Sequence, residues 1–258
     1  MKPFDKTDIV RRLAQAHGYR RYLEITTSTT GHRFEAARAA GYEVCRRLVY
    51  RCPPDFDDGQ PIDFRTGGED TAECVARIRS ECRPFDVMLV DPHHTYECSM
   101  RDLRDAFSLL REGGTLVVHD CDPPDRQHAI PHFVPGPWCG VTYKAFLDFV
   151  MGNEAADYYT VDADYGCGVI TKLSRRGAFG RSCRRILSGR MQRRIEAEWL
   201  RVGEDCDAAY RLFANHRARL LNLVAVEEFH RRYPPPDRCA ESDEVTRGAI
   251  HHGSQAVT

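Results

Sequence analysis

The chain has 258 residues, of which 42% are hydrophobic and 29% are charged, and its formal net charge is −1. This length fits one large domain with an appendage better than two full domains, and the apolar content excludes a wholly disordered chain. No apolar run approaches the ~18 residues of a membrane span. The charged N-terminus lacks the apolar stretch that follows in a secretory signal, so we expect no leader of that kind.

The cysteines argue against a secreted protein. There are eleven, an odd number spread from Cys45 to Cys239, and no CxxC pair occurs among them. Such a distribution disfavours both a disulfide scaffold and a tetrathiolate zinc site, and it is typical of reduced thiols. We therefore expect a cytoplasmic protein.

The small net charge hides an uneven distribution. Residues 1–174 carry 21 Lys and Arg against 27 Asp and Glu, or −6, whereas residues 175–233 carry 14 against 7, or +7; residues 234–258 carry 2 against 4, or −2. A basic segment on an acidic body can bind nucleic acid or anionic lipid, or it can be a helical appendage with arginines on its solvent-exposed face. The second interpretation is favoured, because no recognised RNA module or aromatic-interleaved basic strand is present.

Helices and strands alternate along residues 1–174, which favours a doubly wound, mostly parallel α/β sheet. The runs 85–91 and 115–120 are apolar without alternation and end in Asp, as expected of strands buried on both faces. Helices are predicted at 5–17, up to residue 40, 69–82, 99–114 and around 141–152; strands are predicted at 20–26, 43–50, 61–66, 85–91 and 115–120, followed by an antiparallel pair at 158–163 and 166–173.

The segment 175–233 is predicted to be an Arg-rich helical extension with two helices, at about 193–203 and 207–233. The second carries a broad apolar surface that includes Leu212, Phe213, Leu220 and Phe229. That surface is too wide to stay in water, so we expect it to dock on the body of the same chain or on a second copy, as a homodimer. The tail, 234–258, is predicted to be disordered.

Polar residues end three of the predicted strands. They are Glu24, Asp91 and the pair His119 and Asp120. In an open parallel sheet, ligands bind beyond the carboxyl ends of the strands, near the point where the strand order reverses. These side chains are therefore the first candidates for a functional site.

The motifs YLEI-x₅-G, IDFRTG and FDVMLVDPHHTYECSMRDLRDAFSLLREGGTLVVHD (85–120) resemble those of class I S-adenosylmethionine-dependent methyltransferases, in particular the small-molecule O-methyltransferase-like branch. The resemblance covers residues 18–173. It implies a seven-stranded Rossmann-like sheet whose last strand is antiparallel, and a cytoplasmic enzyme that binds S-adenosylmethionine. The cofactor residues that it implies are Glu24, Thr26, Ser28, Gly31, Asp63, Gly67 and Asp91.

Two parts of the cofactor site depart from the family pattern. Family members carry glycines in an E-x-G-x-G-x-G loop, where this chain has Thr26, Ser28 and Thr30 before Gly31. The acid that ends the second strand in the family is also missing, because no acid follows that strand before Asp55. Glycines permit a close approach of the backbone to a ligand, and the side chains here narrow that space.

The resemblance further implies a divalent metal, Mg²⁺ or Mn²⁺, on Asp91 and Asp120. The ion would lower the pKa of an acceptor hydroxyl. The predicted catalytic residues are Asp91, His94, His119 and Asp120, with either histidine as a further ligand or His94 as a general base. Alternatively, His119 and Asp120 only cap the sheet.

The predicted function is S-adenosylmethionine-dependent methylation of a small hydroxylated acceptor. The alternative is a protein of methyltransferase fold that has lost this cofactor and serves as a binding or assembly partner. A metal-dependent hydrolase at the Asp/His cluster is a third hypothesis. The long loop at 122–137, with its aromatic residues, is expected to be a lid over the acceptor.

Overall fold

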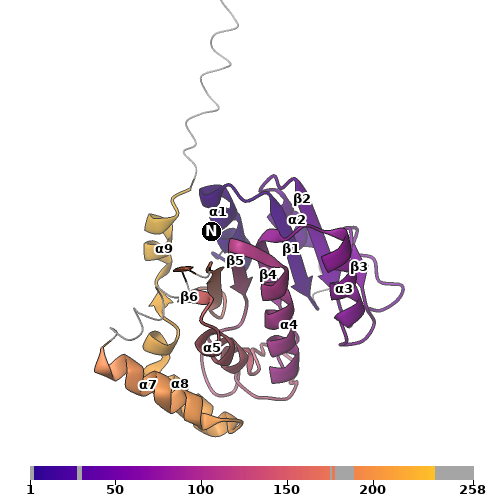
Figure 1. The fold of residues 1–258 in the computed structure, drawn as a ribbon. Helices are drawn as coiled ribbons and strands as arrows, with labels where there is room; N and C mark the ends of the chain where they lie inside the picture. The colour runs from indigo at the N-terminus through magenta and orange to yellow at the C-terminus, as the bar shows by residue number, and fades with distance from the viewer. Residues whose placement is uncertain (1–2, 28–30, 175, 178–188, 236–258) are drawn as a thin grey trace, which may run out of the picture.

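The computed structural model describes residues 3–27, 31–174, 176–177 and 189–235 (Figure 1). The helices are α1 (Lys6–His17), α2 (His32–Arg38), α3 (Ala72–Glu81), α4 (Tyr96–Leu109), α5 (Thr142–Gly152), α7 (Arg190–Val202), α8 (Cys206–Leu220) and α9 (Val226–Arg232). The strands are β1 (Arg21–Thr26), β2 (Val44–Val49), β3 (Phe64–Arg65), β4 (Phe85–Asp91), β5 (Leu110–Val118), β6 (Ala156–Val161), β7 (Cys167–Lys172) and β8 (Leu223–Val224).

The strands form one sheet in the order β3-β2-β1-β4-β5-β7-β6-β8. Strands β1 to β5 are parallel, whereas β7 runs antiparallel to both β5 and β6. The expectation of a doubly wound sheet that closes with an antiparallel hairpin is confirmed. The sheet has eight strands rather than seven, because the C-terminal extension adds the two-residue strand β8 in parallel to β6.

Helices cover both faces of the sheet (Figure 1). On one face, apolar residues of α3, α4, α5, α7 and α8 pack against alternate strand positions such as Leu23, Val90 and Val118. On the other face, α1, α2 and α9 pack against the intervening positions, including Val87 and Leu89. Burial on both faces explains why the central strands are uniformly apolar.

Side-chain caps fix where α1 and α4 begin, close to the carboxyl ends of the strands. The Asp5 carboxylate accepts hydrogen bonds from the backbone of Thr7 and Asp8, in a capping box that begins α1. The Thr95 side chain caps α4 by accepting from the backbone N–H of Cys98. Lys6 therefore lies in the first turn of α1, and His94 immediately precedes Thr95, the N-cap residue of α4.

The extension packs onto the body of its own chain through α7 and α8, which lie together beside α5 (Figure 1). Trp199 of α7 is 2% exposed, contacts the ring of Tyr143 and donates a 2.8 Å hydrogen bond from Nε1 to Asp148 Oδ1. The apolar residues that suggested a homodimer are thus covered within the chain. The homodimer and the domain boundaries after residues 174 and 233 stay predictions.

The prediction of one continuous helix over 207–233 is wrong. The helix α8 has a non-helical residue at His216 and ends at Leu220; β8 and the short helix α9 follow. The break contains Asn222, whose φ of +47° belongs to the left-handed region that asparagine tolerates. The predicted tail lies outside the described residues beyond Pro235.

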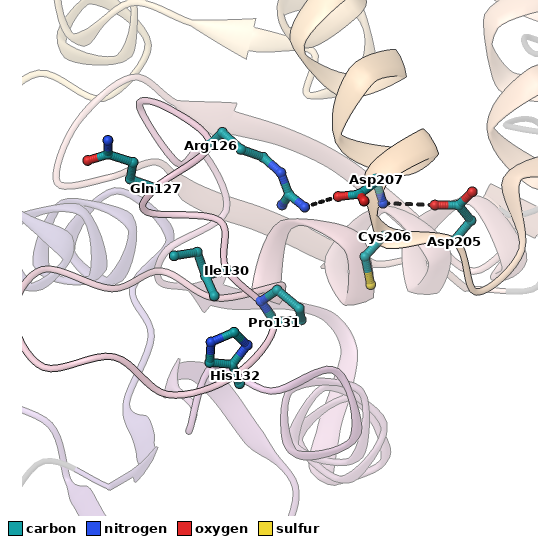
Figure 2. A pocket seen from close by; sticks show the side chains of 8 residues that line it. All are labelled: Arg126, Gln127, Ile130, Pro131, His132, Asp205, Cys206 and Asp207. Carbon is teal, nitrogen blue, oxygen red and sulfur yellow. Dashed lines mark hydrogen bonds and ion pairs between the residues drawn. The ribbon is translucent and has the colours of Figure 1, made fainter.

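A cavity of about 530 Å³ lies between the loop that follows β5 and the start of α8 (Figure 2). Arg126 of the loop forms an ion pair with Asp207 of α8 across it, and Asp205 caps α8 by accepting from the Asp207 backbone. The predicted lid, the loop 122–137, is therefore joined to the extension by the ion pair between Arg126 and Asp207.

Two expectations about the whole chain can be compared with the described residues. Every cysteine among them is a free thiol. In the same part of the chain, none of the helices combines the length and the apolar character that crossing a membrane requires.

Candidate active site at the strand ends

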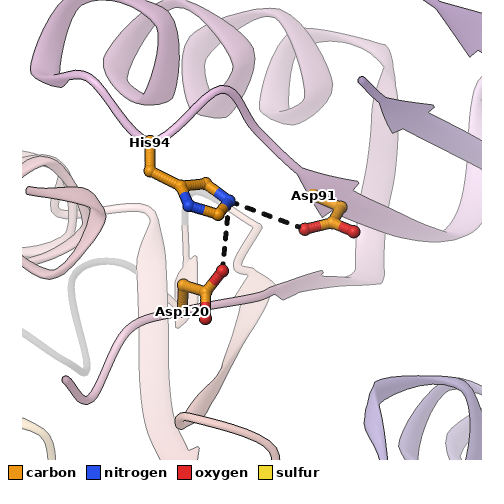
Figure 3. A group of neighbouring side chains, drawn as sticks. All are labelled: Asp91, His94 and Asp120. Atoms are coloured by element: carbon orange, nitrogen blue, oxygen red, sulfur yellow. Dashed lines mark ion pairs between the residues drawn. The ribbon is translucent and has the colours of Figure 1, made fainter. Parts of the chain in front are cut away.

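Asp91, His94 and Asp120 converge at the carboxyl ends of β4 and β5 (Figure 3). Nε2 of His94 lies 3.1 Å from Oδ2 of Asp120 and 3.9 Å from Oδ1 of Asp91. The sequence prediction that the two aspartates share one site agrees with this geometry. Their meeting follows from parallel pairing, which brings the ends of β4 and β5 to the same edge of the sheet.

Asp120 turns toward this group through an unusual backbone conformation. Its φ is +60°, in the left-handed region that few residues other than glycine and Asn or Asp adopt. The residue is 3% exposed, and its carboxylate lies 2.9 Å from Nδ1 of His119 as well as near His94. A left-handed aspartate held between two histidines is a feature that concentrates at functional sites.

Lys6 and Asp164 complete the cluster from distant parts of the chain. The Lys6 ammonium donates a 2.8 Å hydrogen bond to Oδ2 of Asp91 and lies 3.0 Å from Nδ1 of His119. Asp164 accepts from the Lys6 backbone N–H at 3.2 Å, and its carboxylate lies 3.2 Å from Nε2 of His119. The cluster therefore combines three carboxylates with three basic side chains.

The charges of the cluster shift the pKa values of Asp91, His119 and His94 toward their ionised forms. Burial opposes ionisation of Asp91, but the Lys6 ammonium and the His119 ring lower its pKa well below the ordinary value. Burial likewise opposes protonation of His119, yet Asp120 and Asp91 raise the pKa of that ring well above the ordinary value. For His94, burial again works against protonation, and the carboxylates of Asp91 and Asp120 raise its pKa overall.

The loop that follows β5 fixes the ring of His94. The carbonyl oxygen of Trp138 accepts a hydrogen bond from Nδ1, so that nitrogen carries a proton and Nε2 faces the carboxylates. Gly140 permits this approach, because a Cβ at its position would lie 2.0 Å from the backbone oxygen of His94. The side chain of His94 is 19% exposed and can be reached from solvent.

A hairpin turn delivers Asp164 to His119. The turn between β6 and β7 is bonded to the loop after β5, since the backbone N–H groups of Cys121 and Asp122 donate to the carbonyls of Gly166 and Tyr165. Asp122 itself is buried and accepts two hydrogen bonds from the Arg217 guanidinium of α8. The extension thus supports the segment that carries Asp120.

The predicted cofactor residues lie around the carboxyl end of β1. Thr26 is fully buried and pairs in register with Asp91, at the point between β1 and β4 where the strand order reverses. Gly31 begins α2, and a Cβ there would lie 2.5 Å from Cγ of Gln60. Ser28 lies outside the described residues.

Two further predicted cofactor residues, Asp63 and Gly67, flank the short outer strand β3. Asp63 accepts from the backbone of Arg47 at 2.9 Å and forms an ion pair with Arg46, both on β2. Gly67 follows β3, and a Cβ there would have only the Cys52 carbonyl oxygen nearby, at 3.7 Å. In this structure Asp63 therefore braces β2.

Glu24 is buried inside the protein rather than placed at an open mouth. Its side chain lies within β1 and accepts a 2.9 Å hydrogen bond from the Tyr22 hydroxyl, and the residue is 3% exposed. Burial raises its pKa to about 7, although the Tyr22 hydroxyl and the Arg47 charge act in the other direction. Its role in holding a cofactor stays a prediction.

Part of the chain matches a known protein family. The family model of a methyltransferase domain matches residues 7–121, from α1 through the end of β5. The resemblance seen in the sequence is confirmed over these residues, which include Glu24, Asp91, His94 and Asp120.

Solved structures similar to this chain include three named methyltransferases. An O-methyltransferase of Bacillus cereus in complex with SAH is 15% identical, with a TM-score of 0.48, 66% of this chain covered and 82% of that one. The O-methyltransferase TomG of Streptomyces achromogenes, involved in tomaymycin synthesis and solved with SAM, is 16% identical (TM-score 0.49; 66% and 80% covered). SAH-bound PaMTH1 of Podospora anserina is 14% identical (TM-score 0.47; 66% and 78% covered).

At these identities and scores, the likeness by itself assigns neither a ligand nor a substrate to this chain. A search of curated proteins finds no match to the sequence. The chemistry of the site therefore has to be argued from its own residues.

Sequence reasoning missed Lys6 and Asp164. One signal could have pointed to Lys6, since the chain has 33 arginines and only four lysines. The three lysines that the structure describes all have defined partners: Lys6 bonds Asp91, Lys144 bonds Asp148, and Lys172 bonds two backbone carbonyls. In a chain so rich in arginine, a lysine marks positions where a compact ammonium fits and a guanidinium does not.

The raised pKa of Glu24 predicts a specific dependence of stability on pH. The folded protein keeps a proton on Glu24 that the unfolded chain releases, so this stabilisation is complete below the ordinary carboxyl pKa and is lost as the pH rises through about 7. We expect Glu24→Gln to match the wild type at pH 4 and to exceed its free energy of unfolding by about 2 kcal/mol at pH 8. Urea unfolding at both pH values measures this; parallel pH profiles of the two proteins would contradict it.

Proposed function

We propose that the protein is an S-adenosylmethionine-dependent methyltransferase that acts on a small hydroxylated acceptor. The observation that carries this proposal is the convergence of His94, Asp91 and Asp120 beside the reversal of strand order between β1 and β4. Ligands of open α/β sheets bind at such a position. The match of residues 7–121 to a methyltransferase domain supports the same reaction class.

The residues around the end of β1 are compatible with the cofactor. Thr26 and Asp91 border the crevice, and Gly31 precedes α2 at a position where the side chains of Gln60 and Asp58 leave no space for a Cβ. We assign these three residues, with Ser28, to the cofactor site. When bound, S-adenosylmethionine supplies an electrophilic methyl group, and methyl transfer then depends on positioning and on removal of the acceptor proton.

His94 is the residue we assign to that proton. Its Nδ1 is held by the Trp138 carbonyl, so Nε2 is the atom that accepts a proton from an acceptor hydroxyl when the ring is neutral; because the carboxylates raise the pKa of His94, the neutral fraction grows as the pH rises through that pKa. Asp120 lies 3.1 Å from Nε2 and stabilises the imidazolium that forms. His119 lies against the carboxylates of both Asp91 and Asp120 and holds them in place.

The donor set does not favour the predicted Mg²⁺ or Mn²⁺ ion. Asp91, His94 and Asp120 offer one ligand atom each within 4.8 Å of one another. The oxygens involved are already engaged, because Nδ1 of His119 lies 3.1 Å from Asp91 Oδ1 and 2.9 Å from Asp120 Oδ2. The Lys6 ammonium holds the remaining oxygen of Asp91. We therefore assign no step of the reaction to a metal.

A second candidate function is that of a methyltransferase-fold protein that has lost its cofactor and binds a partner. The substitution of Thr26 for a family glycine favours it, as does the end of β2, where Arg51 pairs with Glu69 in place of a free acid. The Thr26 side chain narrows the cofactor crevice, and the Arg51–Glu69 pair changes the charge at its edge.

Calorimetric titration distinguishes the two functions. We expect S-adenosylmethionine and S-adenosylhomocysteine to bind in the micromolar range, and adenosine alone to bind at least roughly tenfold more weakly. The control variant is Cys206→Ser. Cys206 lines the cavity in Figure 2, so this substitution leaves the strand ends untouched. Absence of binding by either cofactor form to the wild type would contradict the enzyme and favour the binding protein.

A further inference from the structure

Lys6 is almost entirely buried, and its burial needs an explanation. The side chain is 2% exposed, and its ammonium lies between Asp91 Oδ2 at 2.8 Å and His119 Nδ1 at 3.0 Å. A buried charge is costly unless it is paired, and breaking such a pair leaves an uncompensated charge behind. Lys6 thus places a positive charge among the carboxylates. Its position is set by α1, because the capping box at Asp5 fixes the first turn of that helix.

The position of this charge coincides with the place where a cation would bind. Asp91 is the central carboxylate of the cluster, with His119 on one oxygen and Lys6 on the other. A divalent ion bridging Asp91 and Asp120 would lie within a few ångströms of the ammonium, and like charges at that separation repel strongly in a buried site. The same ion would also have to displace His119 from both carboxylates.

We propose that the Lys6 ammonium is the resident cation of this site, and that it excludes divalent metal ions from Asp91 and Asp120. Lys6 is then a positioning residue, because it holds Asp91 in place, while Asp120, which lies between His119 and His94, orients His94. The catalytic consequence, a metal-independent reaction, rests on the proposed function. The exclusion of metal does not, because it concerns only the side chains of the cluster.

Titration with Mn²⁺ alone tests the proposal without cofactor or substrate. The wild type is expected to bind Mn²⁺ only weakly, in roughly the millimolar range, as proteins without a metal site do. The Lys6→Met variant keeps the length of the side chain and removes its charge. We expect this variant to bind Mn²⁺ roughly tenfold or more tightly than the wild type, in a 1:1 complex followed by the electron paramagnetic resonance signal of free Mn²⁺.

A matched control exists in the Lys144–Asp148 pair, which is also largely buried and joined at 2.7 Å. Lys144→Met removes a similar charge from a pair that shares no residue with the cluster, and it should leave Mn²⁺ affinity unchanged. Adding Asp120→Asn to Lys6→Met should abolish the gained affinity. Circular dichroism establishes that each variant is folded.

Two results would overturn the proposal. One is micromolar, stoichiometric binding of Mn²⁺ to the wild type that Asp91→Asn removes, which needs no Lys6 variant. The other is a folded Lys6→Met variant with unchanged Mn²⁺ affinity. Neither result depends on methyl transfer, so failure of this proposal is distinguishable from failure of the proposed function.

Discussion

Replacing Trp199 with alanine is expected to lower the free energy of unfolding by about 3–5 kcal/mol, the range observed when large aromatic side chains are removed from cores. Trp199 is 2% exposed and packs beside Tyr143 of α5. Its Nε1 donates to Asp148 Oδ1, so the variant loses a buried hydrogen bond as well as apolar contacts. Equilibrium unfolding in urea, followed by circular dichroism, measures the change.

The adjacent residue supplies the control for this prediction. Leu200 lies in the same helix but is 57% exposed, so Leu200→Ala should change the free energy of unfolding by only about 0.5 kcal/mol or less. If both variants lose the same small amount, the extension does not dock on the body in solution. The basic segment would then be available as an arm for an anionic partner.

The fold of the body could be predicted because its strands have a strong pattern. Residues 85–91 are apolar without alternation, and the structure buries them on both faces of the sheet. The extension could not be predicted as well, because its apolar positions continue through the break at Asn222. After Asn222 the chain forms the strand β8, which pairs with β6, instead of continuing the helix. Tertiary contacts, and not the local sequence pattern, favour this strand.

The candidate site was predictable where residues follow strands and unpredictable where they come from elsewhere. Asp91 and Asp120 end parallel neighbours, so their proximity follows from topology alone. Lys6 and Asp164 are 158 residues apart and meet only because α1 and the β6–β7 turn pack at the same edge. Glu24 ends inside the sheet because strand alternation directs it to the side of Tyr22, which a count of strand-end residues does not reveal.

Replacing His94 with glutamine is expected to have the largest effect on activity. If His94 accepts the acceptor proton, its loss should lower kcat by about 10²–10⁴-fold, the usual contribution of general base catalysis. Glutamine retains a polar side chain that can reach the Trp138 carbonyl, so the loop after β5 should keep its position. Affinity for S-adenosylmethionine should change little, because His94 lies on the acceptor side of the carboxylates.

The neighbouring histidine separates this catalytic role from a structural one. The ring of His93 contacts Trp138 and Phe133, at centroid distances of 5.5 and 6.5 Å, instead of the carboxylate cluster. His93→Gln should therefore alter KM for the acceptor more than kcat, since it changes the wall of the loop and leaves the proton-accepting Nε2 of His94 in place. Equal losses of kcat in the two variants would mean that the histidines only support the loop, and the base would have to be sought at Asp120.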